Sequence, residues 1–478
     1  MKSIDYPCII VLILFIAFSL AYSMIVPVFN APDEPFHFEY IRFLAQNREL
    51  PNQAVEERAI STEGFNPPLY YAINAPFLRV LSPNQGSDIH IHGYEDIVNL
   101  SRYPHQGFGS ETYPPLNPRY VKWGRGRDLN MFLTTKEDTF PFSGGIRLVH
   151  LLRILSVVCG ALTILFIFTT ARTLFTGNKD LALLAMGIAA FNPQFNFLSG
   201  SLNNDNLVIL LATISLWLVA RLMRKDYRKQ NRLVIPLGIV LGLGFITKAN
   251  IAAIALVALA GIIVVSLADN AQKLRVLSVN LVLFLVMIVG IAGWYFVRNI
   301  LIYGRNDPFG WNLLAAQNPG LILPAQMRTM FFKRIFFPRL FTSFWGLFDW
   351  LTVPLPGWAY WIYGLISLTG IAGLIKVFRS KRHDSRAKIC MLLFVAAILI
   401  TVGNLVVMNF TFASAQARLI FPVLAGFCIF MAIGVHWVLT YPARLLSMRT
   451  HLWTYAFILF LILLDLYTLV RVVYPVYR

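Results

Sequence analysis

Residues 7–29 read PCIIVLILFIAFSLAYSMIVPVF, and residues 30–37 continue as NAPDEPFH. The first stretch has no charged side chain and is long enough to cross the hydrocarbon core of a bilayer, which is about 30 Å thick. Residues 21–23 loosely resemble a signal-peptidase site, so cleavage is the alternative interpretation. In both cases the residues that follow are exported, and we favour an uncleaved transmembrane helix.

Composition places the whole chain in the membrane class. Of its 478 residues, 57% are hydrophobic and only 13% are charged, against about 45–50% and about 25% in soluble domains. This excludes an ordinary soluble enzyme, and the high hydrophobicity excludes a disordered chain. The net charge is +18. Because the basic residues cluster between apolar runs, they indicate cytoplasmic loops that face anionic lipid, and not a nucleic-acid partner.

Apolar runs recur along the chain. Ten follow the first, at about 146–171, 181–200, 206–222, 233–248, 250–268, 277–297, 357–377, 388–408, 419–439 and 452–470. Connecting stretches 221–232 and 376–388 are rich in Lys and Arg, whereas 199–206 and 409–417 contain neither. By the positive-inside rule, eleven spans with a cytoplasmic N-terminus satisfy every short loop. We therefore predict an all-α integral-membrane bundle of about eleven transmembrane helices.

This topology divides the chain into five parts. They are a first transmembrane helix (1–29), an extracytoplasmic loop subdomain with juxtamembrane helices (30–145), transmembrane helices two to seven (146–297), a second extracytoplasmic loop with interfacial helices (298–356), and transmembrane helices eight to eleven (357–478). The two large loops and the C-terminus then lie outside the cytoplasm. The four cysteines lie in or beside apolar runs, which disfavours a disulfide framework.

Two adjacent acids follow the first span. Asp33 and Glu34 lie between Pro32 and Pro35, and the apolar positions of 36–44 recur with helical spacing. One interpretation is that Asp33 only caps a helix. The functional interpretation is that the rigid turn holds a carboxylate at the outer membrane face, where it takes a proton from an acceptor hydroxyl.

Two further polar sequences precede predicted helices on the same side. Residues 66–71 read NPPLYY, and their prolines are suited to begin a helix. Residues 201–206 read SLNNDN. Their Asp205 is either another helix cap or a second acid that shares a site with Asp33.

Three basic residues lie at the predicted outer ends of spans, namely Lys248, Arg298 and Arg418. Ionisable residues at this depth are functional candidates, and a phosphate at headgroup level is their natural partner. The alternative for each is snorkelling to the interface. His90 and His92, with His105 nearby, are only a weak metal candidate because no further ligand follows at a clear spacing.

These residues together resemble the GT-C superfamily of polytopic glycosyltransferases. The Asp33-Glu34 pair matches the acidic motif of their first outer loop, and residues 67–71 and 244–248 look like elements of the protein-mannosyltransferase and aminoarabinose-transferase branches. A largely uncharacterised bacterial membrane family is the closest likeness. It shares the sequences at residues 32–37, 203–205 and 343–346, but Leu419 stands where that family more usually has an aromatic residue.

The resemblance implies an inverting transfer from a polyprenyl-phosphate sugar to a cell-envelope glycan or glycolipid, in the bacterial inner membrane and on its extracytoplasmic face. Asp33 would be the general base, Glu34 would assist it, and Asp205 would be the second acid. Substrate and lipid-phosphate binding would fall to the remaining motif residues, which are Lys248, Arg298, Arg418, His37, Tyr70, Tyr71 and Asn204. A divalent metal stays open, because only some superfamily members need one.

Two other functions stay open at this point. One is a transporter, polymerase or ligase of lipid-linked glycans, and the other is a non-catalytic membrane scaffold. A transporter should carry ionisable residues near the membrane midplane. The predicted spans are nearly uncharged except at their ends, with Asp465 as the main exception, which favours a site at the membrane surface. The sequence has neither a nucleotide-binding glycine loop nor a serine nucleophile elbow, which disfavours ATP-driven chemistry and a serine hydrolase.

Overall fold

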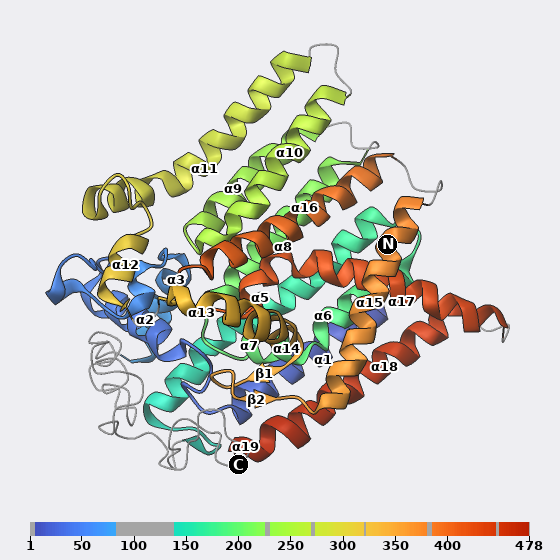
Figure 1. The fold of residues 1–478 in the computed structure, drawn as a ribbon, viewed down its shortest axis with the longest axis horizontal. Helices are drawn as coiled ribbons and strands as arrows, with labels where there is room; N and C mark the ends of the chain where they lie inside the picture. The colour runs from blue at the N-terminus through green and yellow to red at the C-terminus, as the bar shows by residue number, and fades with distance from the viewer. Residues whose placement is uncertain are drawn as a thin grey trace.

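The eleven predicted spans correspond to helices of one bundle. The computed structural model describes residues 5–82, 138–224, 230–268, 273–319, 322–379, 385–445 and 449–477, so the histidines at 90, 92 and 105 lie outside the described residues. Nine helices of the described part are long and apolar enough to cross a membrane. They include α1 (Tyr6–Ile25), α5 (Gly144–Leu174), α8 (Asp205–Leu222), α10 (Ala252–Ala268), α11 (Lys273–Tyr303), α15 (Gly357–Arg379), α16 (Ser385–Met408), α17 (Leu424–Leu445) and α18 (Thr450–Thr468). Figure 1 shows α10, α11 and α16 running in a similar direction.

The other two predicted spans depart from a simple straight helix. The helices α6 (Lys179–Ala190) and α7 (Pro193–Ser199) form one pair that is bent by 64°. Asn192 and Pro193 cause the break, because the proline cannot continue the preceding helix and the Asn192 side chain accepts a bond from Phe195 N at 3.1 Å. The second departure is α9 (Val234–Phe245), an apolar helix shorter than a usual span. The predicted all-α membrane fold is confirmed.

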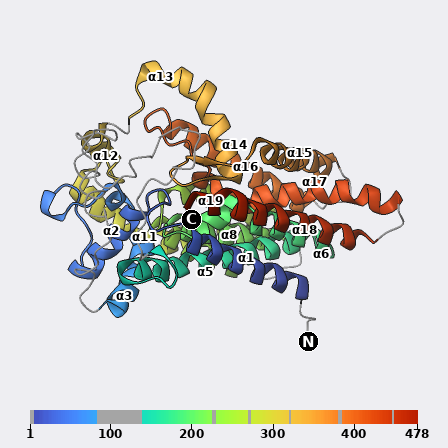
Figure 2. The same ribbon diagram turned by 90° about the horizontal axis from the view of Figure 1, so that it is seen from below.

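Short elements gather at one end of this bundle. Figures 1 and 2 place α2 (Glu34–Asn47), α3 (Leu69–Leu81) and α12 (Trp311–Gln317) together there. Short 3₁₀ segments connect the helices, namely η1 (Glu56–Arg58) and η2 (Thr62–Phe65) between α2 and α3, and η5 (Gln230–Leu233), η6 (Ala249–Ile251) and η9 (Ala417–Val423) between longer helices. The turn from α1 into α2 and the starts of α3 and α8 thereby come close to η9, as the contacts below show.

The second predicted outer loop is mostly helical as well. It contains α13 (Ala325–Met330), the π-helical η8 (Phe331–Phe336) and α14 (Phe337–Trp345), followed by the two short strands β1 (Leu347–Phe348) and β2 (Val353–Pro354). The strands are antiparallel and pair Leu347 with Pro354. The chain ends its described part in η10 (Leu469–Val473) and α19 (Tyr474–Tyr477).

Helix packing in the bundle relies on small residues at the closest crossing. Gly434 on α17 faces the backbone of Thr369 on α15, and a Cβ added at Gly434 would overlap that backbone. A Cβ added at Gly373 of α15 would likewise overlap the backbone of Gly434. The two helices therefore pack backbone to backbone, which is the usual role of small residues between membrane helices.

A buried carboxylate joins three helices inside the bundle. Asp465 of α18 accepts from the Tyr22 hydroxyl of α1 at 2.8 Å and from Asn196 Nδ2 of α7 at 2.7 Å. All three side chains are fully buried or nearly so. Because both carboxylate oxygens have partners, the satisfied acid acts as a cross-link that holds α7 in place.

Candidate active site

The turn between α1 and α2 separates the two adjacent acids. Asp33 occupies the N-cap position of α2 with a φ of 67°, in the left-handed region that Asp tolerates better than most residues. Its side chain makes no capping bond to the helix. Instead the Asp33 carboxylate accepts a hydrogen bond from the Arg418 guanidinium of η9. The interpretation of Asp33 as a simple helix cap is therefore wrong.

Arg418 connects the acidic turn to the start of α8. One guanidinium nitrogen donates to Asp33, another donates to Pro32 O at 3.3 Å, and Nε lies 3.8 Å from Asp205 Oδ2. The Arg418 side chain is 11% exposed and that of Asp33 is 29% exposed. The arginine thus lies at the edge of the solvent with two carboxylates around it.

Asp205 is the second acid that the structure brings into this cluster. It is fully buried, and its Oδ1 accepts from Lys248 Nζ at 2.7 Å. Lys248 also donates to Asn204 Oδ1 at 3.2 Å. The capping bond that Asp205 was expected to supply comes from Asn203, whose Oδ1 accepts from Asp205 N at 2.8 Å. Asn203 therefore leaves the Asp205 carboxylate available for the two cations.

A third carboxylate, Glu63 of η2, extends the cluster and was missed by the sequence analysis. The Tyr71 hydroxyl donates to Glu63 Oε2 at 3.1 Å, and His37 Nδ1 lies 3.4 Å from the same oxygen. The Tyr71 hydroxyl also accepts from Asn204 Nδ2 at 3.1 Å and lies 2.9 Å from His37 Nδ1. A continuous polar chain thus runs from Glu63 through Tyr71 and Asn204 to Lys248.

Burial and charge give these groups different proton affinities. Burial raises the pKa of the Asp33 carboxyl, but the positive groups around it, Arg418 foremost among them, together hold that pKa below the ordinary 3.8. Burial and then the charge of Asp33 raise the pKa of Glu63 to about 7. Burial lowers the pKa of His37 to about 3, so its ring is neutral at physiological pH.

Glu34 has partners that Asp33 lacks. Its carboxylate accepts from Arg153 Nε at 2.8 Å and Nη2 at 2.6 Å, and also from the backbone N–H groups of Phe29 and Leu202, both at 2.8 Å. Glu34 is fully buried and Arg153 is 1% exposed. Arg153 further donates to the carbonyls of residues 23, 26 and 27. This geometry indicates a structural role for Glu34. The partners of its carboxylate do not include Asp33, so no contact supports the predicted assistance to Asp33.

Two other predicted site residues have local partners. Arg298 donates to Pro51 O at 2.6 Å and to its neighbour Asn299 at 3.2 Å. The Tyr70 hydroxyl lies 2.8 Å from Ser156 Oγ and accepts from Asn203 N at 3.1 Å. Tyr70 therefore supports the loop before α8, whereas Tyr71 belongs to the polar chain.

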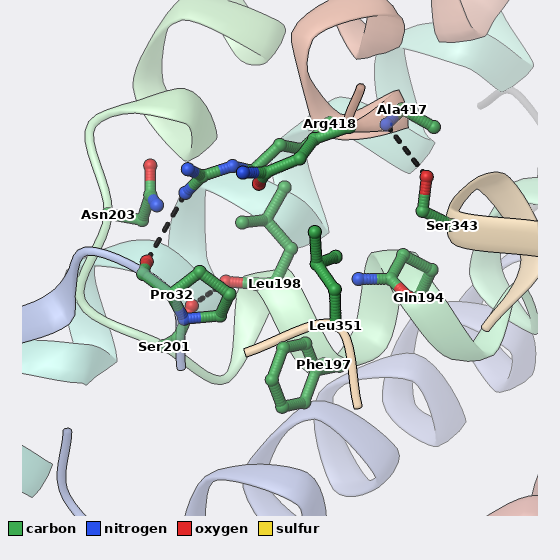
Figure 3. A pocket seen from close by; sticks show the side chains of 11 residues that line it. Pro32, Gln194, Phe197, Leu198, Ser201, Asn203, Ser343, Leu351, Ala417 and Arg418 are labelled. Carbon is green, nitrogen blue, oxygen red and sulfur yellow. Dashed lines mark hydrogen bonds between the residues drawn. The ribbon is translucent and has the colours of Figure 1, made fainter. Parts of the chain in front are cut away.

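A pocket opens beside Arg418. Figure 3 shows Arg418, Pro32 and Asn203 at one side of it with Ser343 and Gln194 opposite. The lining residues are Pro32, Gln194, Phe197, Leu198, Ser201, Asn203, Ser343, Leu351, Gln416, Ala417 and Arg418. Apolar and uncharged polar groups thus line the space next to the cation.

Two buried polar atoms of the cluster lack hydrogen-bond partners. They are Asp205 Oδ2 and Arg418 Nε, and unmet groups of this kind are costly unless a ligand or solvent satisfies them. Within the described ranges, no group of three or more His, Cys, Asp or Glu side chains is placed to hold a metal ion.

Comparison with known proteins identifies the fold. The family model of dolichyl-phosphate-mannose-protein mannosyltransferases matches residues 149–294, which is less than a third of the chain. No curated protein matches. The archaeal oligosaccharyltransferase AglB from Archaeoglobus fulgidus, solved with an inhibitory peptide and a dolichol-phosphate, is 14% identical with a TM-score of 0.52, covering 100% of this chain and 56% of its own.

Two further solved structures are similar. The oligosaccharyltransferase of Archaeoglobus fulgidus in complex with Zn and sulfate has a TM-score of 0.50 at 14% identity, covering 98% of this chain and 52% of that one. ArnT from Cupriavidus metallidurans bound to undecaprenyl phosphate has a TM-score of 0.48 at 14% identity, covering 97% and 73%. This chain spans about half the length of the oligosaccharyltransferase. The resemblance to the GT-C superfamily is confirmed at the level of the fold.

Proposed function

We propose that this protein, whose bundle has the GT-C fold, is a membrane glycosyltransferase. It transfers a sugar from a polyprenyl-phosphate-linked donor to a glycan or glycolipid of the cell envelope, on the extracytoplasmic face of a bacterial inner membrane. The observation that carries the proposal is the pairing of two carboxylates, Asp33 and Asp205, with two cations, Lys248 and Arg418, beside an open pocket. The dolichol-phosphate bound to the related archaeal fold supports a lipid phosphate as the donor class.

Arg418 and Lys248 are suited to the phosphate of the donor. Arg418 borders the pocket, so a phosphate oxygen there would gain a charge-assisted bond from its guanidinium. In the transfer, the bond between the anomeric carbon and the phosphate oxygen breaks, and its electron pair stays on the phosphate. Positive groups held near that oxygen stabilise the charge that develops.

Asp33 is the proposed general base. A phosphate that recruits Arg418 weakens the ion pair between Arg418 and Asp33, and the loss of this pair raises the proton affinity of the carboxylate. Asp33 then accepts the proton of the acceptor hydroxyl while the acceptor oxygen forms the new bond to the anomeric carbon. A single displacement of this kind inverts the anomeric centre.

Lipid-phosphate binding is the first test of this function. The protein in nanodiscs should gain thermal stability when a polyprenyl phosphate is added, because a ligand of the folded state stabilises it by mass action. Arg418→Ala and Lys248→Ala should lose most of that shift. The surface variant Arg58→Ala, altered at a side chain that is 58% exposed, should keep it. No shift in the wild type at saturating lipid contradicts the donor class.

Variants at Arg298 and Asp33 make the test more specific. Arg298→Ala should retain the lipid-induced shift, because Arg298 bonds to Pro51 and not to the cluster. Asp33→Asn should still bind the lipid phosphate but lose sugar transfer in a reconstituted assay. An Asp33→Asn protein that folds and transfers sugar at the wild-type rate excludes the base role.

A further inference from the structure

Glu63 is the charged group of the cluster that lacks a cation of its own. Its side chain is 12% exposed, and its hydrogen-bond donors are the Tyr71 hydroxyl and Asn66 Nδ2, both neutral. The facing imidazole of His37 is held in place by the same Tyr71 hydroxyl. A negative charge on Glu63 is therefore stabilised only at a distance.

The charges of the site balance without Glu63. Asp33 and Asp205 carry two negative charges, and Lys248 and Arg418 carry two positive charges in direct contact with them. An anionic ligand that enters this balanced site meets no net repulsion. An ionised Glu63 makes the whole cluster negative, and the electrostatic cost falls on any phosphate that binds beside it.

We propose that Glu63 is a positioning residue that controls phosphate binding through its proton, such that the neutral acid admits the lipid phosphate and the ionised carboxylate opposes it. The proposal rests on the proposed function, because the phosphate is the one assigned to Arg418 and Lys248. The polar chain from Glu63 through Tyr71 and Asn204 to Lys248 provides the physical connection. By linkage, a bound phosphate must in turn favour the protonated form of Glu63.

The neighbours of Glu63 leave it as the group of this cluster that titrates near neutrality. Its pKa is raised to about 7 by burial first and by the Asp33 charge second. From α2, His37 has a pKa of about 3, and the pKa of Asp33 lies below 3.8. From α3, burial holds the pKa of Tyr71 well above 10.

Charged groups on other elements also face this region. Lys248 and Arg418 lower the pKa of Glu63 by their charge, although burial outweighs them. Glu39 of α2 packs against the same loop, where it accepts from Ser61 N at 2.9 Å. A change in affinity centred near pH 7 therefore reports on Glu63 itself.

The test is the pH dependence of binding of a probe whose own charge is constant. A polyprenyl methyl phosphate is a diester with one negative charge between pH 5.5 and 8.5, whereas a phosphate monoester titrates near pH 6. Binding is measured by the ligand-induced thermal shift in nanodiscs of a zwitterionic lipid. For the wild type we expect about tenfold weaker binding at pH 8 than at pH 6, as one proton with a pKa of about 7 requires.

Glu63→Gln separates the charge from the shape. Glutamine keeps an oxygen that accepts from Tyr71 and carries no charge, so its binding should equal that of the wild type at pH 6 and stay constant to pH 8. The control Glu49→Gln, at an exposed side chain, should keep the wild-type slope.

Three results overturn the proposal. They are equal wild-type affinity at both pH values, an unchanged slope in Glu63→Gln, and a Glu63→Gln variant that loses binding at every pH. The first two leave the proposed function intact if the wild type binds the diester and Lys248→Ala does not. Absence of binding by the wild type at every pH removes both.

Discussion

Removing one partner of the buried pair between Arg153 and Glu34 should lower the free energy of unfolding more than removing any other single charge at this end of the bundle. Arg153 lies on α5 and binds the end of α1, the connecting turn and the first residue of α2 at once. Arg153→Met removes the side-chain donors of that junction. It also leaves the fully buried Glu34 carboxylate without a counter-ion.

The expected magnitude follows from burial. At an effective dielectric constant of about 20, two unit charges about 4 Å apart attract by about 4 kcal/mol. Measured losses on removing one partner of a buried pair are about 3–5 kcal/mol, because the remaining charge stays desolvated. We expect Arg153→Met near the upper end, since carbonyls of residues 23, 26 and 27 lose their donor too. Glu34→Gln should lie near the lower end, since it keeps one acceptor oxygen.

The assay is reversible unfolding in mixed detergent and SDS micelles, followed by tryptophan fluorescence. Both single variants and the double variant Glu34→Gln/Arg153→Met complete a double-mutant cycle. The double variant should cost less than the sum of the single variants, because neither charge is then left unpaired. The exposed pair of Glu49 and Arg58, with charged atoms 3.7 Å apart, is the matched control and should contribute about 0–1 kcal/mol.

Two results would refute this reasoning. If Arg153→Met unfolds with the wild-type free energy, the junction does not depend on the pair. If Glu34→Gln abolishes sugar transfer while its unfolding free energy is unchanged, Glu34 acts in catalysis as the sequence analysis expected.

Three further outcomes are expected. Asp465→Asn should keep the fold and lower thermal stability modestly, because an amide oxygen still accepts from one donor; a large loss of lipid-phosphate binding with unchanged stability would contradict the cross-link. Gly434→Ala should destabilise the bundle by about 1–3 kcal/mol through overlap with the α15 backbone, whereas Gly403→Ala, where a Cβ meets nothing, should be neutral or stabilising. Since the folded-state pKa of Glu63 exceeds its ordinary 4.5, the folded state retains a proton that the unfolded state loses, and stability should fall by about 3 kcal/mol as pH rises from about 4.5 to above 7. Unfolding free energies measured across that range should show a shallower fall in Glu63→Gln.

Hydropathy predicted the bundle well because a span needs little beyond length and the absence of charge. The predicted spans differ from the structure where a local feature of the sequence or the helix length departs from this hydropathy rule. The bend between α6 and α7 arises from an asparagine cap and a proline inside an otherwise apolar run. The short α9 is apolar throughout, so its sequence gives no sign that it falls short of a full span.

The sequence singled out those residues of the candidate cluster whose charge is conspicuous by itself. Asp33, Asp205, Lys248 and Arg418 stood out as charges at the ends of apolar runs, and the structure brings these four together. Their pairing was beyond the sequence, because Asp33 and Arg418 are separated by 385 positions. Glu63 gave no signal except its place three residues before the NPPLYY sequence.

Arg153 is the miss for which a signal existed. It lies inside the second predicted span, where a charged residue is expensive and needs a partner. Asp33 and Glu34 are the two acids of the turn that follows the first predicted span, so one of them was available as the partner of Arg153. Treating the pair as one catalytic unit concealed that possibility.

The geometry of the turn explains why neighbouring acids have such different tasks. With Asp33 in the left-handed conformation, its side chain meets Arg418, while Glu34 enters the buried junction with Arg153. The buried pair therefore fixes the position from which Asp33 meets its cation. Loss of Glu34 should impair both stability and transfer, whereas Asp33→Asn should impair transfer alone. The contrast between these two variants, measured in the same preparations, separates positioning from catalysis within two consecutive residues.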